Sequence, residues 1–270
     1  MVMDGCDQVY HLAADININN KDADKTFKIN IQGTENILQA CIEKKVKRLV
    51  YVSSIHAFSL PPKGQQINEE TPLCDEDDKR GVYDRSKAKA TRKVLNTKAE
   101  GFEAVVVCPT GVVGPYDFEP SFFGKGMIES IQSGLKITVP GGFDYVDVRD
   151  VADGIISAMK NGKSYQIYLL GNEYRTMKEY FGYLAELSGI PVKTTVLPFW
   201  LAKTMGYVLN LFSDNSSITD YSVDTLMENA DISHEKASKE LGYKPRSMKE
   251  SITDQYNWFK DNGYFKTKEK

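Results

Sequence analysis

The 270-residue chain lacks several features that mark other classes of protein. Its cysteines are few (Cys6, Cys41, Cys74 and Cys108) and have no C-x-x-C spacing, so they match neither a zinc site nor a disulfide framework. The net charge of −3 and the pI near 5.8 provide no basic surface of the kind that binds nucleic acid. We therefore expect a reduced, cytoplasmic protein with no metal site and no nucleic-acid partner.

Long apolar runs are also missing. The segment Met1–Asp7 has neither the basic start nor the apolar run of a signal peptide. The most apolar stretch, Val196–Phe212, is interrupted by Pro198, Lys203 and Gly206, and it is too short and too polar to span a membrane. It predicts a buried or pocket-lining helix, with a membrane-surface patch as the alternative, and we expect no membrane partner.

No Gly-x-Gly-x-x-Gly or Gly-x-x-Gly-x-x-Gly occurs in the chain. In nucleotide-binding folds such a turn lies between the first strand and the first helix and holds the pyrophosphate. Because the chain opens within a few residues of a predicted strand, the strand–helix units that would supply the turn are absent from it. We expect either a truncated sequence or a protein that does not bind the cofactor its other residues suggest.

Strand-like and helix-like segments alternate through the first part of the chain. Short β-branched runs predict strands at Gln8–Leu12, Leu49–Ser53 and Ala104–Cys108. Apolar residues at helical spacing predict helices from Thr34 to about Lys45 and from Tyr83 to about Leu95. This order is typical of an α/β fold, so we predict a doubly wound parallel sheet with helices on its faces.

The remainder of the chain lacks this regularity and is mostly helical. The expected elements are helices at 120–133 and from Asp150 to Lys160, strands at 137–139 and 166–170, and two further helices opened by capping boxes at Thr176 and Ser247.

Tyr83 and Lys87 are the strongest indication of chemistry. Four residues make about one helical turn, so the two side chains share one face of the predicted helix. An ammonium stabilises a phenolate, so we expect Lys87 to lower the pKa of Tyr83 toward neutrality and to make it an acid/base group. Ser54, directly after a predicted buried strand, is placed to hold the same substrate oxygen at the edge where parallel sheets bind ligands. Hydride transfer beside a nicotinamide suits such a trio.

The Tyr-x-x-x-Lys spacing alone is weak evidence. The same spacing recurs from Tyr174, Tyr256 and Tyr264, and none of these follows a comparable strand. A surface pair is the alternative interpretation of Tyr83 and Lys87.

A polar, acidic segment from Ser59 to Gly81 joins Ser54 to Tyr83. It predicts a solvated surface loop, and partial cover of the site is the alternative.

Seven motifs that follow one another along the chain resemble those of the extended short-chain dehydrogenase/reductases, also described as the NAD-dependent epimerase/dehydratase family. They are Asp7-x-Val-Tyr-His-Leu-Ala-Ala14, Asn30-x-x-Gly-Thr-x-Asn36, Val50-Tyr-Val-Ser-Ser54, Tyr83-Asp-Arg-Ser-Lys87, Cys108-Pro-Thr-Gly-Val-Val-Gly-Pro-Tyr-Asp117, Tyr145-Val-Asp-Val-Arg-Asp-Val-Ala-Asp153 and Leu241-Gly-Tyr-Lys-Pro245. Within the family, the chain looks most like the dihydroflavonol reductase and 3β-hydroxysteroid dehydrogenase branch.

The resemblance implies a Rossmann-type fold without its Gly-rich N-terminal part. It implies an incomplete NAD(P)-binding domain over residues 1–115 and a smaller, mostly helical substrate-binding region over 116–270. Within that region, about 143–172 would return to the Rossmann sheet.

The resemblance also assigns roles to residues. Ser54, Tyr83 and Lys87 fall on the catalytic Ser, Tyr and Lys, and Lys87 would also bind the nicotinamide ribose. Asn30 falls on a position that orders the sheet near the site, and we expect it to be structural. Besides Tyr83 and Lys87, the positions expected to contact the cofactor are Ala13, Ala14, Pro109, Thr110, Gly111 and Val112.

Three departures from the family pattern bear on cofactor and substrate. The residue that chooses between NAD and NADP is absent, so either is expected. Ile55-His56 stands where sugar dehydratases carry Asp-Glu, and Thr110-Gly111 stands where sugar-nucleotide epimerases commonly have Asn. Both substitutions disfavour a sugar-nucleotide substrate.

The expected substrate side is aromatic and apolar. Its candidate residues are His56, Tyr116, Phe118, Phe122, Tyr145 and Arg149. Two of them have structural alternatives, because Arg149 also suits an ion pair with the neighbouring aspartates and His56 also suits simple packing. The scarcity of cations favours a small, fairly apolar substrate over a diphosphate.

We therefore expect an NAD(P)-dependent oxidoreductase that interconverts a ketone and a secondary alcohol, with Tyr83 as the acid/base. Two alternatives stay open: a sugar-nucleotide epimerase or dehydratase with bound NAD, and an inactive fragment that lacks the pyrophosphate-binding turn. The resemblance also implies a homodimer paired through the helices around Tyr83 and Thr34.

Overall fold

The computed structural model describes residues 3–16, 22–62, 64–75, 77–78, 80–138, 140–191, 193–201, 204, 226 and 231–265. The chain divides into two compact units, and each consists of three separate stretches. Unit 1 contains residues 1–110, 151–170 and 231–244, and unit 2 contains 111–150, 171–230 and 245–270. The chain thus first passes from unit 1 to unit 2 after residue 110. The stretch 231–244, which the sequence placed with the substrate region, belongs to unit 1.

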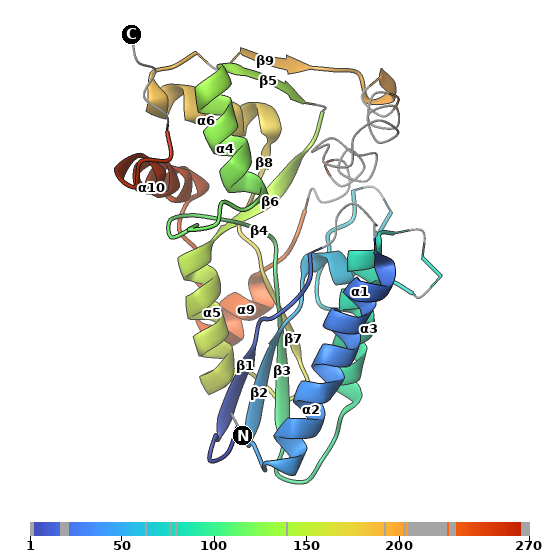
Figure 1. Ribbon diagram of the computed structural model, residues 1–270. Coiled ribbons are helices and arrows are strands. Elements are labelled where there is room, and N and C mark those ends of the chain that lie inside the picture. The colour runs from blue at the N-terminus through green and yellow to red at the C-terminus, as the bar shows by residue number, and fades with distance from the viewer. Residues whose placement is uncertain are drawn as a thin grey trace. The chain divides into compact units, whose positions relative to one another are not determined.

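Unit 1 is built on a four-stranded parallel sheet. Its strands are β1 (Gln8–His11), β2 (Arg48–Val52), β3 (Glu103–Pro109) and β7 (Ile167–Leu170), in the order β1-β2-β3-β7. The helices α1 (Ala23–Phe27), α2 (Gly33–Glu43) and α3 (Val82–Asn96) cover one face, while α9 (Glu235–Leu241) and the part of α5 (Val148–Asn161) after residue 150 cover the other (Figure 1). This arrangement confirms the predicted α/β fold with a doubly wound parallel sheet.

The two central strands are buried on both faces, which explains their continuous apolar sequences. In β2, Leu49, Val50 and Tyr51 are at most 1% exposed, and Val105 to Cys108 of β3 are completely buried. Cys41 and Cys108 are free thiols inside the core and pack as small hydrophobic side chains, as predicted. The predicted ends of all these strands differ from the observed ends by at most two residues.

The segment before α2 contains a π-helical turn that the sequence pattern did not predict. Residues Lys28–Gln32 form this turn (η1) between α1 and α2, and Asn30 lies in it, buried. A π-turn widens the helix by one residue, and such turns frequently occur at functional sites.

The described part of the acidic 59–81 segment is fixed to unit 1, which differs from the solvated loop expected from its charge. Ile67 and Cys74 are buried, and Phe58 pairs with Leu73 in an isolated bridge. The side chain of Glu69 accepts a hydrogen bond from the Leu169 backbone N–H of β7 at 3.0 Å. Charged residues of this segment, such as Glu69, therefore help to fix it to the unit 1 sheet.

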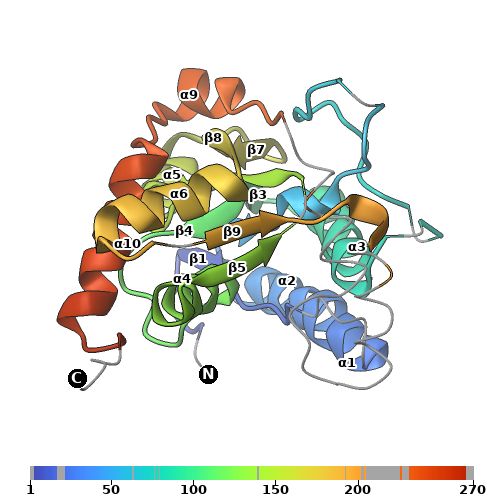
Figure 2. The same ribbon diagram turned by 90° about the horizontal axis from the view of Figure 1, so that it is seen from above.

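Unit 2 combines a mixed sheet with helices. Its elements are β4 (Gly111–Val113), β6 (Gly142–Asp147) and β8 (Glu173–Thr176) in one sheet, the pair β5 (Leu135–Thr138) and β9 (Lys193–Val196), and the helices α4 (Phe122–Ser133), α6 (Met177–Ser188) and α10 (Met248–Asp261). Figure 2 shows the β5–β9 pair beside α4 and α6. Strands β4, β6, β8 and β9 were not predicted.

Two predictions about caps had different outcomes. Thr176 caps α6 with both hydrogen bonds of a capping box, as its spacing with Glu179 predicted. Asp150 was expected to cap α5, but this helix begins at Val148 and Asp150 lies in its first turn. The Asp150 carboxylate instead pairs with Arg246 at 2.9 Å and accepts the Arg246 backbone N–H, which is why it is unavailable as a cap.

None of the described helices is long and apolar enough to cross a membrane. Of the helix expected within 196–212, Phe199 to Leu201 are helical, while residues 202–203 and 205–212 lie outside the described part of the chain.

Candidate active site

The carboxyl edge of the unit 1 sheet brings together chain segments that are far apart in the sequence. Strands β1, β2 and β3 are parallel and in register, so the residues that follow them lie along one edge. Ala13 and Ala14 follow β1, Ser54 follows β2, and Pro109 ends β3 with Thr110 next to it. Ala13 is exposed. The Thr110 N–H donates to the Leu170 carbonyl at the end of β7.

Tyr83 meets Ser54 at this edge. Tyr83 lies in the first turn of α3 and is 8% exposed, and Ser54, after β2, is 7% exposed. The two side chains lie close enough for Ser54 to lower the pKa of the Tyr83 hydroxyl. A long loop separates these two residues in the sequence, so the packing of α3 onto the residues after β2 is what joins them.

Lys87 lies one turn further along α3 and is 2% exposed. Its Nζ donates to the carbonyl of Val52, the last residue of β2, at 2.7 Å and lies 4.6 Å from the centre of the Tyr51 ring. Among the described residues, Val52 is the one acceptor recorded for this ammonium, which has three protons. Lys87 thus contacts the end of β2, the strand that Ser54 follows, and it lies one helical turn from Tyr83 on α3.

The pKa values differ from the expectation that Lys87 would make Tyr83 more acidic. Burial raises the pKa of Tyr83 to about 12, although the nearby Ser54 side chain acts in the opposite direction. Burial also lowers the pKa of Lys87 to about 8. The physical reason is that both groups are removed from water, and desolvation disfavours a phenolate and an ammonium alike. In the chain alone, Tyr83 is a protonated phenol at neutral pH.

A second set of buried polar residues joins α3 to the turn after β1. The Asn30 side chain donates to the Asp15 carbonyl at 2.9 Å and to Ser86 Oγ at 2.8 Å, and it accepts the Asp15 backbone N–H at 2.7 Å. Ser86 Oγ in turn donates to the Tyr83 carbonyl at 2.7 Å. Asn30 therefore fixes the backbone around Tyr83 and the turn that carries Ala13 and Ala14.

His56 lies beside the trio and is held by residues that the sequence did not single out. Its Nδ1 is 3.1 Å from the carboxylate of Asp84, which is completely buried, and 3.5 Å from Nη2 of Arg80. Its ring stands edge-on to the Tyr83 ring, with centroids 6.0 Å apart. Asp84 also accepts the Gly81 N–H at the start of α3. Acidic residues are common at this helix position because they cap the helix. The sequence alone therefore did not predict that Asp84 also contacts His56.

The remaining candidate residues belong to unit 2. Tyr116, Phe118 and Phe122 are exposed, at 61%, 69% and 47%. Gly111 and Val112 lie in β4, paired with β6. A Cβ at position 111 would approach the Asp144 carbonyl to 2.9 Å, so glycine is required there for packing.

Tyr145 and Arg149 differ from the substrate-facing roles expected for them. Tyr145 is completely buried in the unit 2 core, stacked on Tyr180, with its hydroxyl directed to Met177 Sδ at 3.2 Å. Arg149 makes two hydrogen bonds to Asp147, at 2.9 and 2.8 Å, and one to Asp254 at 2.7 Å. These contacts satisfy its guanidinium with carboxylates, which matches the structural alternative.

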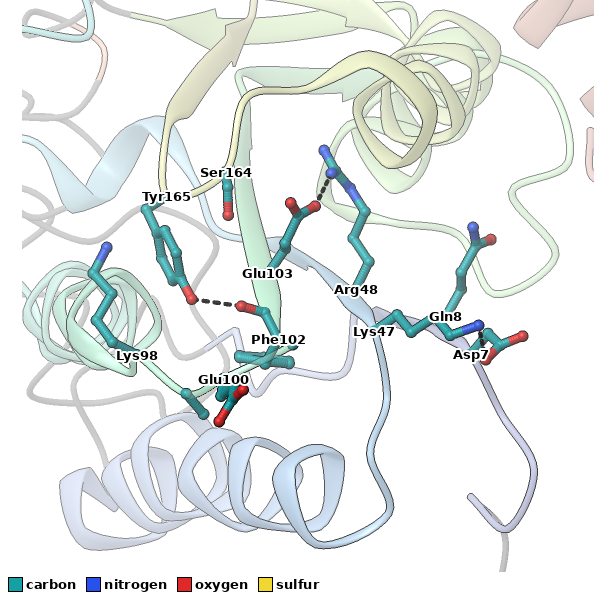
Figure 3. Close-up of a pocket in the computed structure, with 12 residues that line it drawn as sticks. Asp7, Gln8, Lys47, Arg48, Lys98, Glu100, Phe102, Glu103, Ser164 and Tyr165 are labelled. Carbon is teal, nitrogen blue, oxygen red and sulfur yellow. Dashed lines mark hydrogen bonds and ion pairs between the residues drawn. The ribbon is translucent and has the colours of Figure 1, made fainter.

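A pocket of about 1040 Å³ lies at the opposite, amino-terminal edge of the unit 1 sheet. Figure 3 shows its lining, with Lys47 paired to Asp7 and Arg48 paired to Glu103. Its charges neutralise one another, and none of the residues predicted to act in catalysis lines it. Ligands of parallel sheets bind at the carboxyl edge, so this pocket is separate from the candidate active site.

Comparison with known proteins agrees with this geometry. Residues 1–171 match the model of the NAD dependent epimerase/dehydratase family. A dihydroflavonol 4-reductase-like protein of Synechocystis sp. is 30% identical over 98% of this chain and 79% of its own length. A ketoreductase of Stigmatella aurantiaca, named for a 4-hydroxy-3-oxo-dihydroquinoline oxide, is 27% identical over 90% of this chain and 74% of its own. The crystal structure of gox2253 superposes with a TM-score of 0.81 at 28% identity, covering 98% of this chain and 81% of that one.

Proposed function

Because this chain belongs to the NAD-dependent epimerase/dehydratase family, we propose that it is an NAD(P)-dependent oxidoreductase that interconverts a ketone and a secondary alcohol. The observation that carries the proposal is that Ser54 lies close to Tyr83 at the carboxyl edge of a parallel sheet, where Lys87, one helical turn from Tyr83, is bonded to the last residue of β2. The names of the reductase-like relative and the ketoreductase favour the same class of reaction.

The residues at this edge fit a nicotinamide nucleotide. The Lys87 ammonium is buried and has protons to donate beyond the one that Val52 accepts, which suits the hydroxyls of a ribose. The small side chains of Ala13 and Ala14 let a ligand approach the backbone after β1. When bound, the nicotinamide would supply or accept the hydride at its C4 carbon.

The protein groups would handle the proton and the substrate oxygen. In the direction of reduction, Tyr83 donates its phenolic proton to the carbonyl oxygen as that oxygen gains negative charge. A pKa near 12 keeps this proton in place at neutral pH until it is needed. Ser54 Oγ donates a hydrogen bond to the same oxygen, and Lys87 stabilises the charge that Tyr83 leaves behind. The apolar residues Leu12 and Ile16, at 54% and 70% exposed, provide apolar surface near this edge.

Label transfer tests this proposal. The purified chain is incubated with NADH or NADPH carrying deuterium at C4, together with a panel of apolar ketones, and the products are examined by mass spectrometry. We expect deuterium on the carbinol carbon of the alcohol, together with micromolar binding of one of the two nucleotides in calorimetry.

Two other outcomes would contradict the proposal. Retention of the label on tightly bound NAD, with turnover of a UDP- or dTDP-sugar, would indicate an epimerase or dehydratase. Failure to bind either nucleotide would indicate that these 270 residues, which contain no Gly-rich phosphate-binding turn, are not an enzyme by themselves.

A further inference from the structure

Helix α3 is attached to the end of β2 through residues spaced one turn apart. Tyr83, Lys87 and Thr91 occur at intervals of four, so their side chains share one face of the helix. Lys87 Nζ donates to the carbonyl of Val52, the last residue of β2. Thr91 is hydrogen-bonded to Ser53, the next residue, with 2.6 Å between the two hydroxyl oxygens. The helix is thus bonded to two adjacent residues that come directly before the proposed catalytic serine.

The direction of the hydrogen bonds at Thr91 is fixed. Its Oγ1 donates its one proton to the Lys87 carbonyl, four residues earlier, at 2.7 Å. Thr91 Oγ1 must therefore accept the proton of Ser53 Oγ. Thr91 is completely buried and Ser53 is 4% exposed, so little water can reach either hydroxyl. Removal of one hydroxyl leaves the other without this partner in the protein interior.

Ser53 is a fixed support because it belongs to the sheet. Its backbone N–H donates to the Val107 carbonyl of β3 at 2.8 Å, which continues the parallel ladder of β2 and β3. The two hydrogen bonds of Thr91 therefore connect the sheet with the α3 backbone at residue 87. They set how closely the helix approaches β2 at the residue whose ammonium reaches the Val52 carbonyl.

A second threonine, at the carboxyl end of α3, shows what is particular to Thr91. Thr97 donates to the Lys93 carbonyl, also four residues earlier and also at 2.7 Å. Such bonds from threonine to the helix backbone are common and alone indicate no function. The Thr97 bond is exposed, whereas Thr91 is buried and is bonded in addition to the strand. The bond to Ser53 is therefore what relates the position of the helix to the site.

We propose that Ser53 and Thr91 are positioning residues, whose mutual hydrogen bond holds Lys87 and Tyr83 at the depth that nucleotide binding and proton transfer require. They act through Lys87 and not on the substrate. Without their bond, α3 is free to move away from β2, and the ammonium no longer has a fixed place beside Val52. This inference rests on the proposed function for its chemical consequence, but the state of Lys87 can be measured without turnover.

The pKa of Lys87 reports this position directly. Burial lowers it from 10.5 to about 8, so a helix that moves away from β2 admits water and lets the pKa rise. It is measured by nitrogen NMR of the lysine side chains in a pH titration, with Lys87→Met to identify the resonance. We expect Thr91→Val to raise the pKa of Lys87 by at least about half a unit. Thr91→Ser keeps the hydroxyl and should leave that pKa unchanged.

Ser53→Ala removes the same hydrogen bond from the side of the strand. It keeps the bond from Thr91 to the Lys87 carbonyl and should raise the pKa of Lys87 equally, so the proposal is testable even if Thr91→Val does not fold. The double variant should show no further rise, because both substitutions remove one bond. Thr97→Val is the matched control and should leave the pKa of Lys87 unchanged. An unchanged pKa in both single variants, or an equal rise in Thr91→Ser, would overturn the proposal even if the variants unfold more easily.

Kinetics separates this proposal from the proposed function. In ketone reduction, we expect Thr91→Val to lower kcat about tenfold, with activity kept in Thr91→Ser and in Thr97→Val. Turnover by Thr91→Val at the parent rate would contradict the role of the bond in the reaction. If the parent chain reduces no ketone, the proposed function fails, and the pKa of Lys87 alone decides the role of Ser53 and Thr91.

Discussion

At the scale of single residues, burial decides the chemistry of the site more than the neighbouring charge does. The Tyr83–Lys87 spacing correctly predicted that both residues lie on one helix, one turn apart, but the sequence could not predict how little water reaches them. With Tyr83 at 8% and Lys87 at 2% exposure, desolvation moves both pKa values toward the neutral forms.

The buried charge of Lys87 therefore lowers the free energy of unfolding, although the residue belongs to the proposed active site. Its pKa in the folded chain, about 8, lies below the ordinary 10.5, so the unfolded chain binds more protons between these pH values. It follows that burying the charge opposes folding at pH 7. Lys87→Met should raise the free energy of unfolding at pH 7 by roughly 1–2 kcal/mol, after allowing for the lost hydrogen bond to Val52, and should abolish turnover. Urea titrations at pH 7 and pH 10.5 check this, because the gain should shrink at the higher pH. A variant that is less stable than the parent at both pH values would contradict the account.

His11 should make the protein sensitive to acid. Burial, reinforced by the charge of Lys87, lowers the pKa of His11 from 6.5 to about 4. Because the unfolded chain binds more protons between those values, the free energy of unfolding should fall as the pH falls from 6.5 to 4, by about 2 kcal/mol from this residue. His11→Gln keeps a donor for Thr34 and should reduce that slope, as measured by urea titration at several pH values. His234→Gln is the control, and an unchanged slope in His11→Gln would be the contrary result.

At the scale of elements, the junction of η1, α3 and the turn after β1 depends on one amide. Asn30→Ala would leave the Asp15 N–H and carbonyl without this partner inside the structure and would remove a hydrogen bond to Ser86. We expect a loss of about 2–3 kcal/mol in the free energy of unfolding. Asn36→Ala, at an exposed position on α2, should change it by less than about 0.5 kcal/mol. Equal effects of the two substitutions in thermal or urea unfolding would show that the buried network contributes little.

The sequence predicted elements well where a hydrophobic period was strong and poorly where tertiary contacts decided. The ends of the unit 1 strands and of helices α2 and α3 were predicted within two residues. Their buried faces place apolar residues at regular spacing in the sequence, which makes such elements recognisable. The π-turn at Asn30 has no such signature, since the Asn30 side-chain bonds form only with distant chain segments. Asp84, Arg80 and the anchoring of Glu69 were missed for the same reason, because charged residues in a polar segment predict solvent exposure.

At the scale of the whole molecule, neither unit is a continuous piece of chain. Unit 1 needs residues 151–170 and 231–244 in addition to 1–110. The first stretch supplies β7, which pairs with β3, and the second supplies α9, whose Glu240 accepts the Tyr168 hydroxyl at 2.7 Å. The boundary that the sequence suggested near residue 115 therefore does not mark a segment that folds alone.

A fragment of residues 1–110 should accordingly fail to fold. It would expose the β7 side of β3 and remove Leu169 from the core. Circular dichroism and urea titration should show no cooperative unfolding for the fragment, in contrast to the full chain. Cooperative unfolding of the fragment with a native-like spectrum would contradict the three-stretch description of unit 1.

The most direct test of the central claim is the turnover of Tyr83→Phe, compared with Tyr174→Phe, which alters a second tyrosine of a Tyr-x-x-x-Lys pair. Nucleotide affinity and ketone reduction are measured for both variants and the parent chain. The account predicts that Tyr83→Phe binds the nucleotide within about twofold of the parent but loses at least about 10²-fold in kcat, while Tyr174→Phe keeps its activity. Reduction by Tyr83→Phe at the parent rate would contradict the assignment of Tyr83 as the proton donor.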